Sequence, residues 1–181
     1  ILSLFIFFFF SLAQTKEIDS IPRKKIQALR INQPIKIDGV FDEEAWNNAP
    51  IATNFVQRSP KNGVPVPDSL RTEVKILYDD TGIYFGAQMF DPEPEKIAKE
   101  MVERDNVGND DLFGVVLNGY NDKQQSLEFV VMPTGVQYDA KITNDNGEDG
   151  SWNGVWYSAA KINEKGWFVE MKIPYSELRF P

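Results

Sequence analysis

The chain of 181 residues contains no cysteine and no histidine, and the two absences exclude several kinds of chemistry. Without cysteine, no disulfide can hold the fold together, so an apolar core has to suffice. Without histidine, the usual general base and the commonest zinc ligand are missing together. Serine–histidine–aspartate triads and histidine-based zinc hydrolases are therefore excluded.

Basic residues are scarce relative to acidic ones. The chain has 19 Lys and Arg against 27 Asp and Glu, a formal net charge of -8. One short basic run, Arg23-Lys24-Lys25, is most simply explained as a solvated linker. A nucleic-acid-binding domain needs a basic face or stripe to neutralise phosphates. We therefore expect no nucleic acid partner.

The first ten residues form an almost purely apolar run that is rich in Phe. Small residues follow at alternate positions in residues 11–13, which is typical of a secretory signal peptide. A membrane-spanning helix would need about 20 apolar residues. We expect a signal peptide over residues 1–13, a mobile lead-in over 14–25 and one domain over 26–181. The protein would then be exported to the periplasm, the outer membrane or the extracellular space.

Apolar residues at alternate positions dominate the rest of the chain, and this period is typical of half-buried strands. The alternating sets are Val74, Ile76 and Tyr78; Phe113, Val115 and Leu117; Leu127, Phe129 and Val131; Tyr138, Ala140 and Ile142; and Trp167, Val169, Met171 and Ile173. Residues 79–82 and 163–166 each end in Gly and have the composition of hairpin loops. The pattern predicts an all-β fold, an antiparallel β-sandwich.

One or two short helices are expected beside the strands. Residues 42–47 form the first, with the Asp42 carboxylate as its cap. Residues 174–178 form the second, because Pro174 suits the first position of a helix.

Several separated motifs follow one another along the chain. They are Ile37-Asp38-Gly39-Val40-Phe41-Asp42-Glu43-Glu44-Ala45-Trp46; Arg104-Asp105 with Asp110-Asp111; Phe129-x-x-Met132-Pro133-x-Gly135-Val136-Gln137-x-Asp139; Trp152-x-x-x-Trp156; and Gly166-Trp167-x-x-Glu170-x-x-Ile173-Pro174-x-x-x-Leu178-Arg179-Phe180. The set resembles the family 9 carbohydrate-binding modules, in the variant at the front of bacterial outer-membrane proteins whose other domain has no assigned function. The resemblance implies a jelly-roll-like sandwich, incomplete at its C-terminal end, that binds sugars without cleaving them. By the same analogy, residues 94–104 form a short turn and then a strand.

In the sugar-binding members of that family, a saccharide is stacked between two tryptophans. Val107-Gly108-Asn109 stands where the first would be, and the second would lie beyond Pro181. Trp152 is the candidate substitute, because we expect it to be partly exposed, whereas Trp46, Trp156 and Trp167 belong in the core. Packing is the alternative role for Trp152.

Acidic residues near the predicted rim of the sandwich are further candidates for ligand binding. Asp105, Asp110 and Asp111 could accept hydrogen bonds from sugar hydroxyls or hold a metal, with Arg104 beside them. The alternative for Arg104 is an internal ion pair.

A polar loop supplies candidate calcium ligands, which are Asn144, Asp145, Asn146, Glu148 and Asp149. Calcium prefers such oxygen donors and often stiffens exported β domains, although the spacing is not that of an EF-hand. A solvated acidic loop is the alternative.

Two functions stay open. The first is a secreted, non-catalytic carbohydrate-binding domain linked to polysaccharide binding or breakdown. The second is a structural periplasmic or outer-membrane domain that precedes a β-barrel and binds no sugar. Carboxylate pairs such as Glu128 with Glu170, or Asp110 with Asp139, could be proposed for glycoside hydrolysis. With 27 acidic residues such pairs arise freely, so we expect no enzyme activity.

Overall fold

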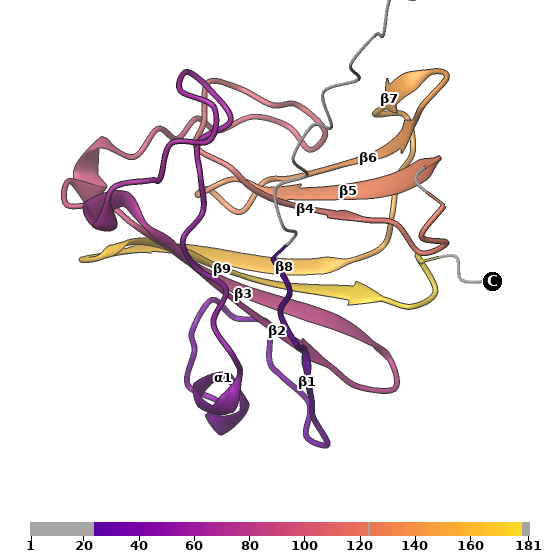
Figure 1. Ribbon diagram of the computed structural model, residues 1–181, viewed down its shortest axis with the longest axis horizontal. Coiled ribbons are helices and arrows are strands. Elements are labelled where there is room, and N and C mark those ends of the chain that lie inside the picture. The colour runs from indigo at the N-terminus through magenta and orange to yellow at the C-terminus, as the bar shows by residue number, and fades with distance from the viewer. Residues whose placement is uncertain (1–23, 123, 179–181) are drawn as a thin grey trace, which may run out of the picture.

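The computed structural model describes residues 24–122 and 124–178. The expected signal peptide and most of the expected lead-in lie outside these residues. Figure 1 shows two β-sheets facing each other. The predicted β-sandwich is therefore confirmed. In the described part of the chain, no helix is long and apolar enough to cross a membrane.

The larger sheet has five strands in the order β1-β2-β3-β9-β8. These are β1 (Leu29–Arg30), β2 (Thr72–Tyr78), β3 (Gly82–Phe90), β9 (Gly166–Pro174) and β8 (Tyr157–Asn163). The pairs are antiparallel, apart from a parallel pairing of β1 with β2 over two residues. Hairpins join β2 to β3 and β8 to β9 at the two predicted loops. β8 is consequently an edge strand.

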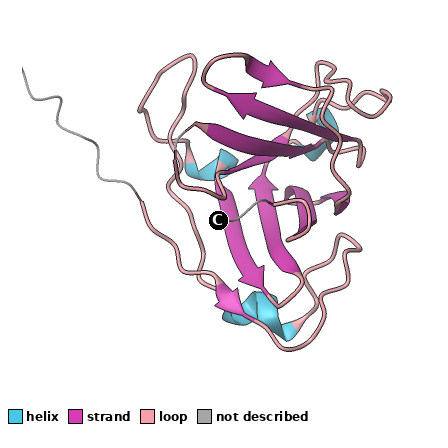
Figure 2. Ribbon diagram, turned by 90° about the vertical axis from the view of Figure 1, so that its right-hand side faces the viewer, coloured by secondary structure: helices cyan, strands magenta, loops and turns pink. Residues whose placement is uncertain are grey.

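The smaller sheet has four strands in the order β4-β5-β6-β7, all antiparallel. These are β4 (Phe113–Leu117), β5 (Gln125–Val131), β6 (Gln137–Thr143) and β7 (Gly147–Asp149). Figure 2 shows the helical pieces at the margins of the strands, not between the sheets. They are α1 (Glu44–Asn48) and two single 3-10 turns, η1 (Asp68–Leu70) and η2 (Pro94–Lys96).

The main core lies between the two sheets and is built from the predicted alternation. Its buried members include Val74, Phe85, Ala87, Leu127, Phe129, Val131, Trp156, Trp167, Val169, Met171 and Ile173. Each large apolar side chain buried in this way contributes about 1.5–3 kcal/mol relative to exposure. The core positions predicted for β5 and β9 are thus confirmed, as are those of Trp156 and Trp167. In β2, Val74 is buried and Ile76 is partly buried against this core, whereas Tyr78 belongs to neither core.

A second, smaller core covers the outer face of the five-stranded sheet. Its buried members are Ile31, Ile35, Trp46, Ala49, Leu77 and Tyr84, so the predicted core position of Trp46 is also confirmed. Figure 1 shows α1 on this side, away from β4 to β7. The buried carboxylate of Glu170 fastens the layer to the sheet. It accepts hydrogen bonds from the Trp46 indole N–H (3.0 Å) and from the backbone N–H groups of Asp38 (3.0 Å) and Gly39 (2.8 Å).

The structure corrects the prediction for β6. Phe129 on the inner face of β5 pairs with Asp139, so Gln137, Asp139 and Lys141 share that inner face. Tyr138, Ala140 and Ile142, which we expected to point into the core, lie on the outer face. A buried carboxylate therefore takes the core position of this strand.

Three local predictions are wrong. The first helix begins at Glu44 after Glu43, and no side chain caps it, so Asp42 has no capping role. Residues 175–178 form turns and not a helix, because Pro174 is the last residue of β9. The turn at residues 94–96 is confirmed, but no strand lies between it and β4 in this described segment.

Candidate functional site

The buried carboxylate of Asp139 ties together three segments at one end of the sandwich. Its Oδ1 accepts a hydrogen bond from the backbone N–H of Gly154 (2.7 Å). Its Oδ2 accepts from the Trp156 indole N–H (2.9 Å) and from Nη2 of Arg104 (2.5 Å). A fully buried charge is costly unless it is paired and hydrogen-bonded, and these donors meet that need. The network fixes the loop that precedes β8 against the start of β6.

Arg104 links this buried carboxylate to the surface. Its side chain is 41% exposed, and it donates to Gln137 Oε1 (2.6 Å) and to the Gly154 carbonyl (3.1 Å). Its Nε lies 3.6 Å from Asp105 Oδ2. The ion-pair alternative for Arg104 is confirmed, with Asp139 as its buried partner. Arg104 and Asp105, both predicted ligand-binding residues, do lie together here.

Trp152 is partly buried and lies at the margin of the main core, as predicted. Its ring meets the Phe129 ring edge-on, with centroids 5.8 Å apart, and Trp156 packs on Phe129 in a similar way at 5.4 Å. Close packing continues at Gly154, where an added Cβ would lie 2.9 Å from the Trp152 ring. Part of Trp152 stays open to solvent beside the Arg104 network.

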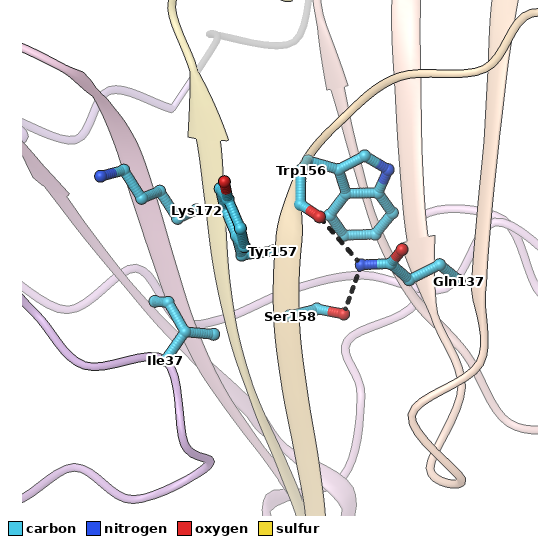
Figure 3. Close-up of a pocket in the computed structure, with 6 residues that line it drawn as sticks. All are labelled: Ile37, Gln137, Trp156, Tyr157, Ser158 and Lys172. Atoms are coloured by element: carbon cyan, nitrogen blue, oxygen red, sulfur yellow. Dashed lines mark hydrogen bonds between the residues drawn. The ribbon is translucent and has the colours of Figure 1, made fainter.

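A shallow pocket of about 560 Å³ adjoins the network at the free edge of β8. It is lined by Ile37, Gln137, Trp156, Tyr157, Ser158 and Lys172. Figure 3 shows Tyr157 and Lys172 on one side of the strand and Gln137 and Ser158 on the other. Gln137 Nε2 donates to Ser158 Oγ (2.9 Å) and to the Trp156 carbonyl (3.4 Å). Gln137 is therefore the residue that joins the pocket to Arg104.

Asp110 and Asp111 bind to a different segment. Asp110 Oδ1 accepts a hydrogen bond from the backbone N–H of Glu100, and the Asp111 N–H donates to the Ala98 carbonyl (3.0 Å). Burial raises the pKa of the Asp111 carboxyl, and the carboxylates of Asp91 and Asp110 add to that effect. No hydrogen bond or ion pair of the described residues joins them to Arg104 or Trp152.

The candidate calcium loop is the β6–β7 hairpin, and two of its carboxylates, Glu148 and Asp149, have partners within the protein. Tyr138 donates a hydrogen bond to Glu148, and Asp149 accepts from the N–H (3.0 Å) and hydroxyl (2.6 Å) of Ser151. Among residues 24–122 and 124–178, no group of three or more acidic side chains is arranged to hold a metal ion. The calcium prediction for this loop stays a prediction.

Comparison with known proteins places this geometry in a family. The family model described as carbohydrate family 9 binding domain-like matches residues 37–181. The chain belongs to this family. A search of the curated proteins finds no match.

Solved family 9 modules share the fold. A module from Caldicellulosiruptor kristjanssonii in complex with cellotriose matches with a TM-score of 0.55 and 20% identity, over 87% of this chain and 70% of that chain. The same kind of module in complex with glucose gives a TM-score of 0.54 and 20% identity, over 87% and 71%. A family 9 module is non-catalytic. In this one, Glu128 and Glu170 lie on the outer faces of opposite sheets, so that pair cannot flank one cleft.

Sequence reasoning missed several residues of the site. Gln137 and Asp139 stand in a motif that carries the family resemblance, but neither is predicted as a ligand-binding residue. Gly154 and Tyr157 are not predicted as site residues. The structure pairs Asp139 with the core residue Phe129, so the carboxylate occupies a position that faces the core. A charged residue at such a position indicates a buried polar contact. Gly154 and Tyr157 became relevant only when the fold brought them to Asp139 and to the edge of β8.

Proposed function

We propose that this family 9 domain binds a glycan, without cleaving it, at the end of the sandwich where Arg104, with Asp105 beside it, and Trp152 both lie against Gly154. The observation that carries the proposal is the partly exposed Trp152 next to a fixed set of polar groups. The apolar C–H face of a pyranose packs well on an aromatic ring, and fixed polar groups orient its hydroxyls. Family membership, and the cellotriose and glucose seen with the solved modules, support the same function.

The finer parts of the proposal concern the context of the domain. We infer that the domain belongs to an exported protein, and the apolar run over residues 1–10 supports this inference. The sequence of the exported protein should then begin at Gln14; a first residue within the apolar run would contradict export by this route. Membership of the outer-membrane variant of the family rests on the motif resemblance.

A structural domain that binds no sugar is the second candidate. It is favoured by one observation: Arg104 and Trp152 already have partners inside the protein, in Asp139 and Phe129 respectively. These contacts could have been retained for stability alone.

Calorimetric titration of the whole protein with cello- and xylo-oligosaccharides separates the two functions. Glycan binding that weakens at least tenfold in Trp152→Ala would support the proposed site. Titration with and without calcium would test the loop at residues 144–149. Absence of binding to any glycan by a folded protein would favour the structural role.

A further inference from the structure

The pocket at the edge of β8 contains an exposed aromatic ring that the proposed site does not use. Tyr157 is 54% exposed, although it is a large side chain at the start of a strand. It belongs to the outer face of the five-stranded sheet, where it pairs with Lys172, and Lys172 in turn pairs with Tyr84. The three side chains form a row across β8, β9 and β3.

The middle member of the row, Lys172, is held by Tyr84. The Lys172 ammonium lies 5.1 Å from the centroid of the Tyr84 ring, within the range of a cation–π contact. Tyr84 is itself buried, and its hydroxyl donates to Asp79 (2.7 Å). A side chain that is ordered before a ligand arrives loses less conformational entropy on binding.

Polar groups converge on the other side of the strand. The Ser158 hydroxyl accepts a hydrogen bond from Gln137, which leaves its own O–H available as a donor. Gln137 Oε1 accepts from Arg104 and has a second lone pair. The Trp156 carbonyl points to the free edge, where Gln137 reaches it. Because alternate residues of an edge strand point the same way, the backbone of Ser158 also faces that edge.

The lining suits a neutral sugar. Lys172 is its one charged member, and no carboxylate lines the pocket. The volume of about 560 Å³ is within the range of small-molecule pockets. An aromatic ring beside hydroxyl, amide and backbone groups offers both a stacking surface and hydrogen-bond partners for sugar hydroxyls.

We propose that this pocket is a second glycan subsite, in which a sugar chain crosses the free edge of β8, with one pyranose unit stacked on Tyr157 and the next unit bonded through its hydroxyls to Ser158 and Gln137. The inference rests on the proposed function and adds a contact surface to it. Since Gln137 also bonds to Arg104, one oligosaccharide could extend from the Trp152 region to this edge.

The test is calorimetric titration of the whole protein and its variants with cellotriose and with glucose. Tyr157→Ala should weaken cellotriose binding at least tenfold, and Ser158→Ala by about threefold. The control is Tyr120→Ala, which removes another exposed tyrosine, 44% exposed and outside the pocket, and should leave binding unchanged. Thermal unfolding of each variant would show that the fold is intact.

The outcomes separate this inference from the function on which it rests. If the unaltered protein binds cellotriose and Tyr157→Ala binds equally well, the subsite is wrong and the proposed function stands. If the folded, unaltered protein binds no glycan, both are wrong. A loss of affinity in Tyr120→Ala equal to that in Tyr157→Ala would also overturn the subsite.

Discussion

Two buried carboxylates hold this protein together in similar ways and differ in one respect. Glu170 and Asp139 are both fully buried, and each accepts hydrogen bonds from a tryptophan indole and from a glycine N–H. Asp139 also pairs with a guanidinium that reaches solvent. The Glu170 carboxylate has neutral donors only among its hydrogen bonds in the described structure.

The difference separates a structural region from a candidate binding region. The Glu170 contacts fasten α1 and the segment before it to the back of the sheet, and none of the donors to this carboxylate is a charged side chain that reaches solvent. The Asp139 contacts fix Arg104, Gln137 and the loop before β8, all of which border solvent or the pocket. The second carboxylate therefore positions groups that a ligand could reach.

The largest effect is expected for Asp139→Ala. The change leaves the Gly154 and Trp156 donors buried without an acceptor and takes away the partner of Arg104, so the free energy of unfolding should fall by about 3–4 kcal/mol. Urea unfolding monitored by tryptophan fluorescence measures it. A loss below about 1 kcal/mol would show that water reaches these donors.

Glu170→Gln should lower the free energy of unfolding by less than Asp139→Ala does. The amide keeps one carbonyl oxygen as an acceptor, while its NH₂ group faces a donor, so about 1–2 kcal/mol of unfolding free energy should be lost. The same urea titration applies. A loss equal to that in Asp139→Ala would mean that the two regions do not differ in the way described.

Arg104→Met should lower the unfolding free energy by about 1 kcal/mol, because the half-exposed guanidinium is screened by solvent. Arg30→Met is the matched control: the Arg30–Asp80 pair is 56% and 85% exposed, and its loss should change stability by less than about 0.5 kcal/mol. Equal effects in the two variants would show that the buried partner adds nothing.

The smallest expected effect is the change with pH in the contribution of Glu170 to stability. Burial, with the nearby Glu43 carboxylate, raises the pKa of Glu170, although the hydrogen bonds from Gly39, Asp38 and Trp46 oppose it. A group whose pKa is raised by folding stabilises the protein below its ordinary pKa, and the contribution is lost as pH rises through the folded value. The stability gap between the unaltered protein and Glu170→Gln should therefore be larger at pH 4 than at pH 7. Urea unfolding at both values checks this, and a gap that grows with pH would refute it.

Asp79 should behave in the opposite sense. Burial pushes its pKa up, but hydrogen bonds from Thr81, Tyr84 and Gly82 outweigh that effect and lower the pKa to about 2. Its contribution is present above the ordinary value of 3.8 and disappears as pH falls toward 2. The contribution of Glu170 to stability is therefore lost as pH rises through its raised pKa, whereas that of Asp79 is lost as pH falls below 3.8.

The sequence predicted the sandwich because alternation in β2, β5 and β9 reports directly on a face that is buried. The prediction for β6 is wrong because alternation assigns the apolar residues to the core, whereas the buried inner residue of this strand is Asp139. The partners that make a buried carboxylate tolerable lie 15 to 35 positions away, at Gly154, Trp156 and Arg104. Such partners are set by the fold and not by local pattern.

The sequence predicted only some residues of the candidate site, because the fold decides which of them come together. Arg104 and Asp105 lie in a turn that docks on β6 through the bond from the Asp105 N–H to the Gln137 carbonyl. Trp152, in the loop before β8, packs beside Gly154, whose carbonyl accepts a hydrogen bond from Arg104. Asp110 and Asp111 belong to a separate backbone contact at Ala98 and Glu100. Asp110 and Asp111 are close to Arg104 in the sequence, but this closeness does not place them beside Arg104 in the structure.

Chemical-shift mapping of the ¹⁵N-labelled protein during a titration with cellotriose tests the central comparison most directly. We predict progressive shifts for Trp152, Gly154, Gln137 and Ser158, and unchanged signals for Asp38, Gly39 and Trp46 in the layer held by Glu170. Shifts confined to that layer, or no shifts at all in a folded protein, would contradict the account.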